Sequence, residues 1–581
     1  MPATPYLLIS SAKELAPFLP ALREAEVIAI DSETTGLDAK NHRLRLLQLA
    51  ISGQPVLIID CFSFLPAGQE MLRELLGGTA TKVMQNARFD LSFLQQQGLT
   101  AAPVFDTMLA AQLLRSSGGP SKASLAAIAL HYLGEEVDKS EQVSDWQGDL
   151  RSEQLQYAAL DADILLRLHQ KLSDELNKHD LQEIARIEFA CVAAVTDMEL
   201  TGIRLDLAAW QALTLQTEKE LNDALRILHG FTGEPDAQTS LLGNEVILEQ
   251  NYDSNPYILQ LLRSQGISVE ATSRRDLAPY LDHPLVKAVL AYRRASKALS
   301  SFLHPFREMI DPRTGRLYPR YWQIGAASGR MSCSDPNIQQ IPREASFRAC
   351  FVAPTDRKLV IADYSQIELR VATEISGDKR MIEAYGEGAD LHRLTASLIL
   401  GIPTGEVTTA QRQAAKAVNF GLIYGMGAAG LQIYAHASYG AEMTLDQARA
   451  FRERFFQAYP GIAAWHQRLQ ALRPTTGKTM TGRKFAFDAE TSLSTLANSP
   501  VQGTAADILK LALGMLAQRL RGTQTHIIAA VHDEILLETA AGEATAVADL
   551  LRSTMEEAGN TILKVVPCVA EAKIVDTWAE K

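Results

Sequence analysis

Cysteine is scarce in this sequence. Its 581 residues include only five, all far apart: Cys61, Cys191, Cys333, Cys350 and Cys568. Because none of them forms a CxxC or similar close pair, we expect neither a disulfide framework nor a structural zinc site, and the pattern favours a reducing cytoplasm. An apolar run of the ~20 residues that span a bilayer is also absent, and the N-terminal segment lacks the basic region and apolar core of a signal peptide. We therefore expect a cytoplasmic protein without a membrane role.

An excess of basic residues is absent as well, since the net charge is −12. This argues only weakly against a nucleic-acid partner, because a local basic groove can coexist with an acidic exterior. Apolar residues make up 47% of the chain, which excludes a disordered protein and allows well-filled cores. The length predicts roughly three to five units of ordinary domain size.

The hydrophobic pattern changes several times along the chain. Residues 26–60 contain three strand-like runs, EVIAIDSETTGL, LRLLQLAI and PVLIIDCF, and then pass into helical patterns. Helical periodicity dominates 180–310, strand signals return at 316–375, and helices dominate again at 376–520. The pattern predicts an α/β or α+β start followed by at least one further mixed domain. We find no short-period repeat and no low-complexity tract.

Acidic residues stand at regular positions in the N-terminal part. Asp31 and Glu33 lie two apart in a predicted strand, so both side chains point to one face. Two such carboxylates repel each other unless a cation lies between them. Asp90 ends the segment NARFD, and Tyr157 and Asp161 share one face of a predicted helix. Each acid alone fits an ordinary surface or capping role, but the joint pattern is much less frequent by chance than any one of its parts.

These D-x-E, N-x-x-x-D and Y-x-x-x-D segments, in this order, resemble the three motifs of the DEDD 3′–5′ exonucleases, and the tyrosine resembles the DEDDy subclass. The stretch DKSEQVSDWQGDLRSEQLQYAALDAD is also similar to ribonuclease D. The resemblance implies an active nuclease in which four acids bind two Mg²⁺ ions and Tyr157 orients the attacking water. The acids are Asp31, Glu33, Asp90 and Asp161.

Two more acids follow strand-like runs in the C-terminal part. Asp363 ends an apolar strand in VIADYSQIELRVA, where it also fits a strand-end turn with a helix-capping role. Asp533 lies between His532 and Glu534 at the predicted turn of an apolar hairpin, THIIAAVHDEILLE. Acids at a buried turn are costly unless a positive partner is present. A pair of distant carboxylates is the usual way to build a two-magnesium phosphoryl-transfer site.

Between these acids, one predicted helix carries a stripe of residues spaced by four: Arg412, Lys416, Phe420 and Tyr424. Positions four apart drift only ~40° around a helix, so the stripe is cationic at its N-terminal end and aromatic at its C-terminal end. Arg and Lys would hold triphosphate oxygens, and the aromatic rings would pack against a sugar and base. An amphipathic core helix with two snorkelling cations is the alternative.

DYSQIELR, RQAAKAVNFGLIYG and VHDE resemble motifs A, B and C of the family A DNA polymerases, in the right order and spacing. Further similar segments are SGRMSCSDPNIQQIP (328–342), DLHRLTA (390–396), TMTGRKF (479–485) and NSPVQGTAADILK (498–510). The resemblance covers essentially the whole chain and its layout is similar to that of the Klenow fragment. No 5′-nuclease segment precedes residue 1, so flap removal is not expected.

The resemblance implies a multidomain chain of α/β and α+β type. A ribonuclease H-like exonuclease domain is expected at 1–175 and a right-hand polymerase domain at 176–581. Within the latter the expected parts are a thumb at about 185–310, a palm at about 311–375 and 498–581, and fingers at about 376–497.

The resemblance also assigns the polymerase site. Asp363 and Asp533, helped by the carbonyl of Tyr364, would bind two Mg²⁺ ions, for which Mn²⁺ would substitute. Glu534 would be an outer carboxylate whose loss slows the reaction without abolishing it. The residues expected to hold the incoming dNTP are Arg412, Lys416, His392, Phe420, Tyr424, Glu368 and Gln366.

Three of these dNTP-binding residues have more specific expected roles. Lys416 would give a proton to the departing pyrophosphate. Phe420, lacking a hydroxyl, would disfavour dideoxynucleotides, and Glu368 would exclude ribonucleotides by closing the space beside C2′.

The primer–template contacts follow from the same resemblance. The residues expected near the primer 3′ end are Arg330, Asn337, Gln339, Asn498, Gln502 and His532. Donors such as Arg330 and Gln502 can check pairing without reading sequence, because minor-groove acceptors are shared by all correct pairs. The family usually has an arginine where this chain has Ser494, which puts one DNA contact in doubt.

The expected function is a monomeric, template-directed DNA polymerase with 3′–5′ proofreading, acting on primer–template DNA and dNTPs in replication or repair, in a bacterial, plasmid or phage setting. One alternative is a ribonuclease D-like exonuclease whose C-terminal part only binds nucleic acid. The pair of acids, the stripe and Glu368 argue against it. A non-catalytic scaffold would leave all of these groups without a purpose.

Overall fold

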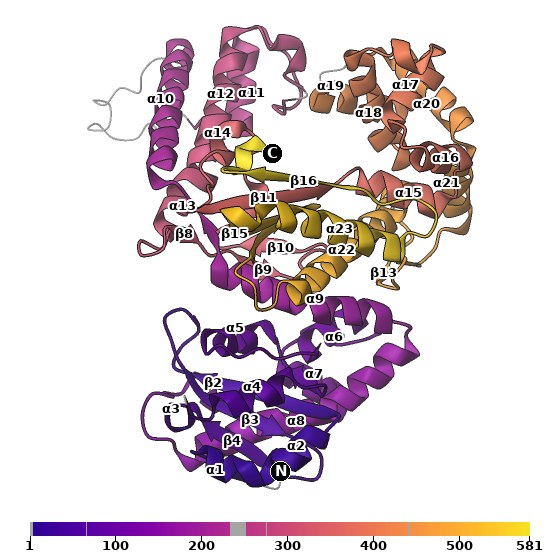
Figure 1. The fold of residues 1–581 in the computed structure, drawn as a ribbon. Helices are drawn as coiled ribbons and strands as arrows, with labels where there is room; N and C mark the ends of the chain where they lie inside the picture. The colour runs from indigo at the N-terminus through magenta and orange to yellow at the C-terminus, as the bar shows by residue number, and fades with distance from the viewer. Residues whose placement is uncertain (1–3, 66, 233–250, 275, 440–441) are drawn as a thin grey trace.

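The computed structural model describes residues 4–65, 67–232, 251–274, 276–439 and 442–581 (Figure 1). An N-terminal sheet domain lies at the bottom of Figure 1, and a second sheet lies above it with helices rising on both sides. Among the described helices, none is long and apolar enough to cross a membrane.

The N-terminal domain is built on a six-stranded mixed sheet in the order β1-β4-β3-β2-β5-β6. The strands are β1 (Tyr6–Ile9), β2 (Val27–Thr34), β3 (Leu44–Ala50), β4 (Val56–Asp60), β5 (Thr81–Met84) and β6 (Val104–Asp106). β3 runs antiparallel to both neighbours, and the other pairs are parallel. The three strands predicted within 26–60 are confirmed, and their apolar side chains form the core of the domain.

Helices cover this sheet. They are α1 (Ala12–Leu15), α2 (Leu19–Glu24), α3 (Cys61–Phe64), α4 (Gln69–Gly77), α5 (Arg88–Gln96), α6 (Thr107–Leu114), α7 (Leu125–Leu133) and α8 (Ser152–Lys178). The long helix α8 packs against β2, β3 and β4 through buried leucines and alanines spaced three and four apart. This packing brings one face of α8 to the strand that carries the first two acids.

The second sheet is antiparallel and four-stranded, in the order β14-β15-β11-β16. Its strands are β11 (Arg357–Tyr364), β14 (His526–Val531), β15 (Glu534–Ala540) and β16 (Ala570–Val575). The hairpin predicted around residue 533 is confirmed, because β14 and β15 pair and leave His532 and Asp533 in the turn. Since β15 also pairs with β11, Asp363 lies directly opposite Glu534.

Two long helices join the parts of the molecule. α22 (Leu493–Arg519) packs along α9 (Gln182–Thr201) and against α23 (Ala544–Ile562), which covers β11 and β16. α9 also packs against β14 and α5. At the α5 contact, the Arg88 guanidinium lies 2.7 Å from Glu199 of α9. The first helix of the expected thumb therefore lies between the two sheets.

The remaining helices form two groups on opposite sides of the second sheet (Figure 1). One group holds α10 (Leu207–Thr232), α11 (Asn255–Ser264), α12 (Pro284–Ala298), α13 (His304–Met309) and α14 (Ala345–Arg348). The other holds α15 (Ile367–Ser376), α16 (Lys379–Gly386), α17 (Leu391–Leu400), α18 (Thr409–Ile423), α19 (Ala428–Tyr439), α20 (Leu445–Ala458) and α21 (Pro460–Leu472). Short strands complete the fold: β7 (Ile203–Arg204), β8 (Arg316–Leu317), β9 (Arg320–Trp322), β10 (Ser332–Ser334), β12 (Thr476–Lys478) and β13 (Lys484–Ala486).

Local sequence explains where α18 begins. The Thr408 hydroxyl accepts a hydrogen bond from the Gln411 N–H (3.3 Å), and the Gln411 side chain accepts one from the Thr408 N–H (2.8 Å). This reciprocal capping satisfies two amide groups that a helix start leaves without partners. It fixes the N-terminal end of the helix that carries the predicted stripe.

Candidate active sites

The structure brings the five predicted residues of the N-terminal site close enough to interact. They come from three elements: Asp31 and Glu33 from β2, Asp90 from α5, and Tyr157 and Asp161 from α8. The Asp90 carboxylate accepts a hydrogen bond from the Ser32 hydroxyl (2.6 Å), which ties α5 to β2.

Charge repulsion is built into this site. Burial raises the pKa of Asp31 well above its ordinary value, and the negative charges of Asp161 and Asp90 raise it further. Burial, followed by the negative charge of Asp31, also raises the pKa of Glu33 well above its ordinary value. Burial raises the pKa of Asp90 to about 7. Carboxylates that disfavour one another's charge in this way are stabilised when a cation arrives.

The donor set fits hard divalent cations. All four acids offer oxygen ligands, and the buried Oδ1 of Asp161 has no hydrogen-bond partner in the described structure. Within the described ranges, however, no three His, Cys, Asp or Glu side chains meet in a ready-made metal-binding arrangement. The Lys139 ammonium lies 2.7 Å from the other oxygen, Asp161 Oδ2. Lys139 lies inside the ribonuclease D-like segment, but its residue type alone gave it no predicted role.

The two C-terminal acids meet at the edge of the second sheet. Asp363 is the last residue but one of β11, and Asp533 lies in the β14–β15 turn, whose His532 adopts a left-handed conformation (φ 60°). The Tyr364 N–H donates to the Asp533 carbonyl (3.3 Å), so the two acid-bearing segments are joined through the backbone. Burial raises the pKa of Asp533, and the Asp363 charge adds to this.

The alternative role of Asp363 as a helix cap is wrong. α15 begins at Ile367, and its N-cap is Gln366, in a left-handed conformation (φ 57°) and without a capping side-chain bond. Asp363 belongs to the strand instead, where it stands between Glu534 of β15 and Glu571 of β16. Its carboxylate therefore belongs to the sheet edge and not to the start of α15.

The C-terminal segment supplies groups that sequence reasoning missed. The Lys581 ammonium lies 3.1 Å from Asp363 Oδ2 and 2.8 Å from Glu534 Oε2. The indole N–H of Trp578 donates to Glu534 Oε1 (2.6 Å). Glu534 is thus buried and held in place by these partners. No motif marks Lys581 or Trp578, because their relation to the acids exists only in the fold.

One cavity of about 700 Å³ unites most of the predicted nucleotide-binding residues with the two acids. Its predicted members are Asp363, Gln366, His392, Arg412, Lys416, Phe420, His532, Asp533 and Glu534. Arg412, Lys416 and Phe420 of the stripe therefore face Asp363 and Asp533, whereas the fourth member, Tyr424, is the C-cap of α18. Two predicted dNTP-binding residues, Glu368 and Tyr424, lie outside the lining of this cavity. So do the predicted DNA contacts other than His532.

The positions of two cavity residues are fixed by neighbouring polar groups. Arg412 Nε donates to Asp390 Oδ2 (2.6 Å), and Asp390 also caps α17. The buried ring of His392 has its Nδ1 2.8 Å from the Asn419 amide, and burial lowers its pKa to about 4. His392 is therefore neutral at ordinary pH and offers a hydrogen bond rather than a charge.

Glu368 is the centre of a second contact group. The Tyr424 hydroxyl donates to Glu368 Oε2 (2.7 Å), and Arg330 forms an ion pair with the same carboxylate. Burial, with the nearby Glu368 charge, raises the pKa of Tyr424 well above its ordinary value. Glu368, the predicted gate against ribonucleotides, and Arg330, the predicted minor-groove donor, are thus paired with each other in this structure.

The other predicted DNA contacts lie on separate elements. Asn337 caps a 3₁₀ turn by accepting from the Gln339 N–H (3.1 Å), and the Gln339 side chain donates to the Ala530 carbonyl of β14 (3.1 Å). Asn498 and Gln502 are half-buried on α22, and Asn498 Oδ1 has no partner in the described structure. Ser494 is exposed in the first turn of the same helix.

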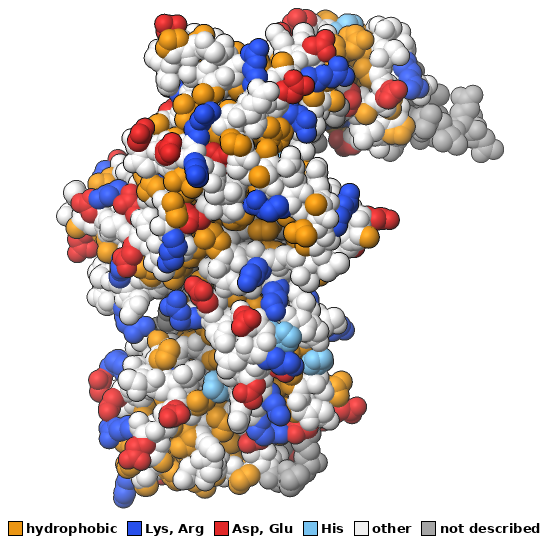
Figure 2. All heavy atoms as spheres, turned by 90° about the vertical axis from the view of Figure 1, so that its right-hand side faces the viewer, with side chains coloured by type: hydrophobic (Ala, Val, Ile, Leu, Met, Phe, Trp, Pro, Cys, Tyr) orange, Lys and Arg blue, Asp and Glu red, His pale blue; other side chains and the backbone are white. Residues whose placement is uncertain are grey.

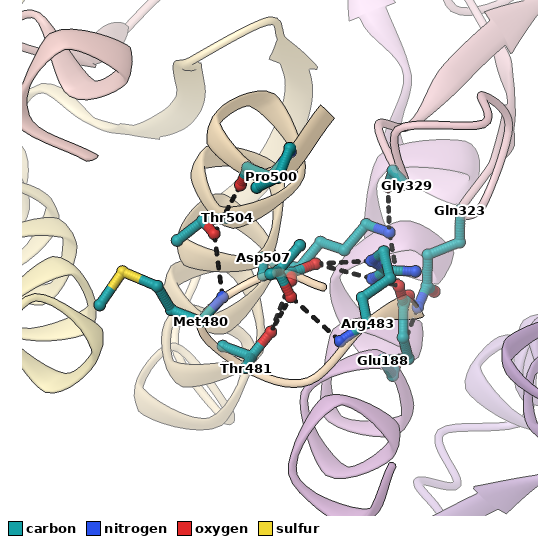
Figure 3. Close-up of polar contacts among 11 residues, drawn as sticks. Glu188, Gln323, Gly329, Met480, Thr481, Arg483, Pro500, Thr504 and Asp507 are labelled. Atoms are coloured by element: carbon teal, nitrogen blue, oxygen red, sulfur yellow. Dashed lines mark hydrogen bonds and ion pairs between the residues drawn. The ribbon is translucent and has the colours of Figure 1, made fainter. Parts of the chain in front are cut away.

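A buried ionic cluster supports the loop that carries Arg330 (Figure 3). Arg483 donates to Asp507 Oδ1 (2.9 and 2.7 Å) and to Glu188, and the Lys510 ammonium lies 2.6 Å from Glu188 Oε1. Lys510 also donates to the Gly329 carbonyl (2.7 Å). Gly329 has φ +82°, and a Cβ atom there would lie 2.4 Å from Arg483 Nε, so only glycine fits.

The outer surface of the molecule carries both basic and acidic side chains (Figure 2). Figure 2 shows Lys, Arg, Asp and Glu side chains interspersed over both parts of the molecule on that face. The cavity, in contrast, is lined by six cations: Arg343, Arg348, Arg412, Lys416, Lys573 and Lys581.

Comparison with known proteins identifies both parts of the chain. Residues 239–580 match the family described as DNA polymerase family A, and residues 6–177 match a 3′–5′ exonuclease family. A relative called DNA polymerase I from Aquifex aeolicus is 34% identical, with 96% of this chain and 97% of the relative covered. A Pseudomonas aeruginosa DNA polymerase I is 32% identical over 97% of this chain, but this chain spans only 64% of it.

A solved structure is similar over nearly its whole length. It is described as the POL domain of Pol1 from M. smegmatis in complex with DNA primer-template and dNTP. The TM-score is 0.81 at 25% identity, with 98% of this chain and 99% of that chain covered. The predicted fold class and family are confirmed. The chain belongs to the family A DNA polymerases and carries a 3′–5′ exonuclease domain ahead of its polymerase domain.

Proposed function

We propose that the chain extends primer 3′ ends with dNTPs under the direction of a DNA template and removes misincorporated nucleotides from the same ends. The observation that carries this proposal is the single cavity in which Asp363 and Asp533 face the Arg412–Lys416–Phe420 stripe. Carboxylates opposite fixed cations are the arrangement that holds a nucleoside triphosphate together with divalent ions.

In the polymerase site, Asp363, Asp533 and the Tyr364 carbonyl would hold two Mg²⁺ ions, with Mn²⁺ as a substitute. When bound, the ions supply positive charge for the attacking oxygen and for the leaving oxygen. Arg412 and Lys416 bind the triphosphate. The primer 3′ hydroxyl would lose its proton to solvent and form a bond to the α-phosphorus, while the bond between the α-phosphorus and the bridging oxygen breaks. Lys416 would give a proton to the departing pyrophosphate.

Selection among nucleotides rests on other residues. His392 and Gln366 complete the triphosphate pocket, Phe420 packs on the sugar, and Tyr424 closes the site near the templating base. Glu368 excludes a 2′-hydroxyl. The primer–template residues are proposed to be Arg330, Asn337, Gln339, Asn498, Gln502 and His532. Glu534 acts as an outer carboxylate, a role that fits its burial beside Trp578 and Lys581.

In the exonuclease site, Asp31, Glu33, Asp90 and Asp161 would hold two divalent ions. When bound, these supply the charge that makes the attacking water nucleophilic. Tyr157 orients the water in line with the bond to the leaving 3′ oxygen of the penultimate nucleotide. The product is a nucleoside monophosphate.

The remaining expectations belong to the same proposal. We propose domain bounds at 1–175 and 176–581, a monomeric state, and a cytoplasmic role in replication or repair. The bacterial origin of the relatives supports a bacterial setting. The proposed parts of the polymerase domain are a thumb at about 185–310, a palm at about 311–375 and 498–581, and fingers at about 376–497. The packing of α9 on α22 and β14 supports grouping this first helix of the thumb range with the palm.

Paired substitutions test the proposal. Asp533→Ala should abolish primer extension and leave degradation of single-stranded DNA intact, while Asp31→Ala should do the reverse. Asp549→Ala, on the exposed face of α23, is the control and should change neither activity. Absence of dNTP incorporation by the unchanged protein on a primed template would favour the ribonuclease D-like alternative. Joint loss of both activities in a folded Asp533→Ala variant would contradict separate sites.

A further inference from the structure

A lysine stands among the exonuclease residues, in addition to the four acids and the tyrosine. The Lys139 ammonium lies 2.7 Å from Asp161 Oδ2 and 3.2 Å from the Tyr157 hydroxyl. It also lies 5.2 Å from the centre of the Tyr157 ring. Asp161 is largely buried, so this contact is screened by solvent much less than a surface ion pair.

The chain on both sides of Lys139 is tied to α8. Upstream, Glu135 forms an ion pair with Arg167 of α8. Downstream, the Gln154 amide of α8 donates to the Ser144 hydroxyl and to the Asp145 carbonyl, both at 2.9 Å. Together these contacts hold the segment between them against the helix that carries Tyr157 and Asp161. Lys139 is thus directed at these two residues by the fold rather than by a freely moving loop.

We propose that Lys139 is a positioning residue of the 3′–5′ exonuclease reaction. An ammonium group only donates hydrogen bonds, so the Tyr157 hydroxyl must accept from it. The phenolic proton must then be donated elsewhere. Burial and the nearby Asp161 carboxylate raise the pKa of Tyr157, so this carboxylate competes with the attacking water for the proton. By pairing with Asp161, Lys139 leaves the proton to the water and so fixes the direction from which the water approaches the phosphorus. The same ammonium holds the Asp161 carboxylate in place. This inference rests on the proposed exonuclease function.

A purely structural role for Lys139 makes a different prediction. If the lysine only held α8 and its neighbouring segment together, its loss would loosen the acids and weaken metal binding. If it positions Tyr157 beside an otherwise intact set of ligands, its loss removes a cation that repels the metal ions, and metal binding is kept or tightened. The two roles therefore differ in the sign of the change in metal affinity.

The first measurement is activity in the full-length chain. Lys139→Met should slow degradation of single-stranded DNA by roughly 10- to 100-fold, the range found for residues that orient metal ligands and reacting groups. Lys139→Arg should recover part of the rate, because the guanidinium is also a cationic donor. Lys178→Met is the matched control, since Lys178 is an exposed lysine of α8 that pairs with Glu175. Primer extension should be unchanged in all three variants.

The second measurement is Mn²⁺ binding by electron paramagnetic resonance. It uses the Asp533→Ala background, in which a proposed polymerase ligand is removed. Lys139→Met should tighten binding at the exonuclease site by roughly three- to tenfold, as expected for removal of a nearby positive charge. Kept or tightened binding beside a slow exonuclease supports the proposal.

Two results would overturn the inference: an unchanged exonuclease rate, or a slow exonuclease with weakened Mn²⁺ binding. Failure of the proposed function is separately visible. If Asp31→Ala degrades DNA as fast as the unchanged protein, the site itself is wrongly assigned. If Asp31→Ala is inactive and Lys139→Met is fully active, only the role of Lys139 is wrong.

Discussion

The buried ionic cluster gives a sharp prediction about stability. Lys510 and Glu188 are both 0% exposed, and they come from α22 and α9, the two helices that join the parts of the molecule. In Lys510→Met, a side chain of similar length stays but the charge is lost. The cluster then holds the carboxylates of Glu188 and Asp507 with only one cation, Arg483.

The magnitude follows from the imbalance of charge. Removing one partner of a buried ion pair costs about 3–5 kcal/mol, because the remaining charge is left without compensation. Arg483 still pairs with Glu188, so we expect the lower end, about 3 kcal/mol. Lys510→Met also removes the donor to the Gly329 carbonyl. A second substitution, Glu188→Gln, restores neutrality, and the double variant should recover about 1–2 kcal/mol of the loss.

Equilibrium urea unfolding measures these differences. Tryptophan fluorescence is a suitable signal, because Trp210 and Trp578 are buried in the polymerase part. The control is Arg449→Ala, which removes an exposed pair with Asp446 and should cost at most about 0.5 kcal/mol. A loss of less than about 1 kcal/mol in Lys510→Met, or a double variant no more stable than Lys510→Met, would refute the reasoning.

Three further predictions concern the two sites. Glu368→Ala should raise ribonucleotide incorporation relative to dNTPs, and an unchanged ratio in single-nucleotide extension would remove its role as a gate. Phe420→Tyr should raise dideoxynucleotide incorporation by roughly tenfold or more, since it adds one hydrogen-bonding hydroxyl beside charged phosphates; equal chain termination would contradict the assignment. Burial raises the pKa of Asp90 to about 7, so its contribution to stability is lost as pH rises from about 4 to about 7. Thermal unfolding in EDTA should therefore shift to lower temperature over this range, and Mg²⁺ should reduce the shift; a pH-independent midpoint in EDTA would count against this.

Local patterns predicted the elements that carry the sites. The apolar runs around Asp31 and Asp363 are strands, and the polar residues His532 and Asp533 do lie in the turn of a hairpin. Spacing by four brought Arg412, Lys416 and Phe420 to one cavity. These predictions succeed because strand alternation and helical periodicity are properties of neighbouring residues, which a single sequence displays directly.

Contacts between distant residues could not be predicted in this way. Glu188 and Lys510 are 322 positions apart, and each alone is a charged residue of a helix, which normally means an exposed face. The pairing of Lys581 with Asp363 likewise depends on how the last residues cross the sheet edge. Lys139 lies in the segment that resembles ribonuclease D, but its neighbours Tyr157 and Asp161 become visible only when that segment packs on α8.

The contact of α9 with both α22 and α5, fastened by Arg88 and Glu199, has a consequence for error correction. The helix lies between the sheet that carries Asp31 and the sheet that carries Asp363 (Figure 1). On the proposed function, a mispaired primer end would have to leave one site and move to the other. Removal of an error would then depend on the rate of adding the next nucleotide relative to the rate at which the primer end separates and transfers. The accuracy of copying would thus be set by these two rates as much as by the chemistry at either site.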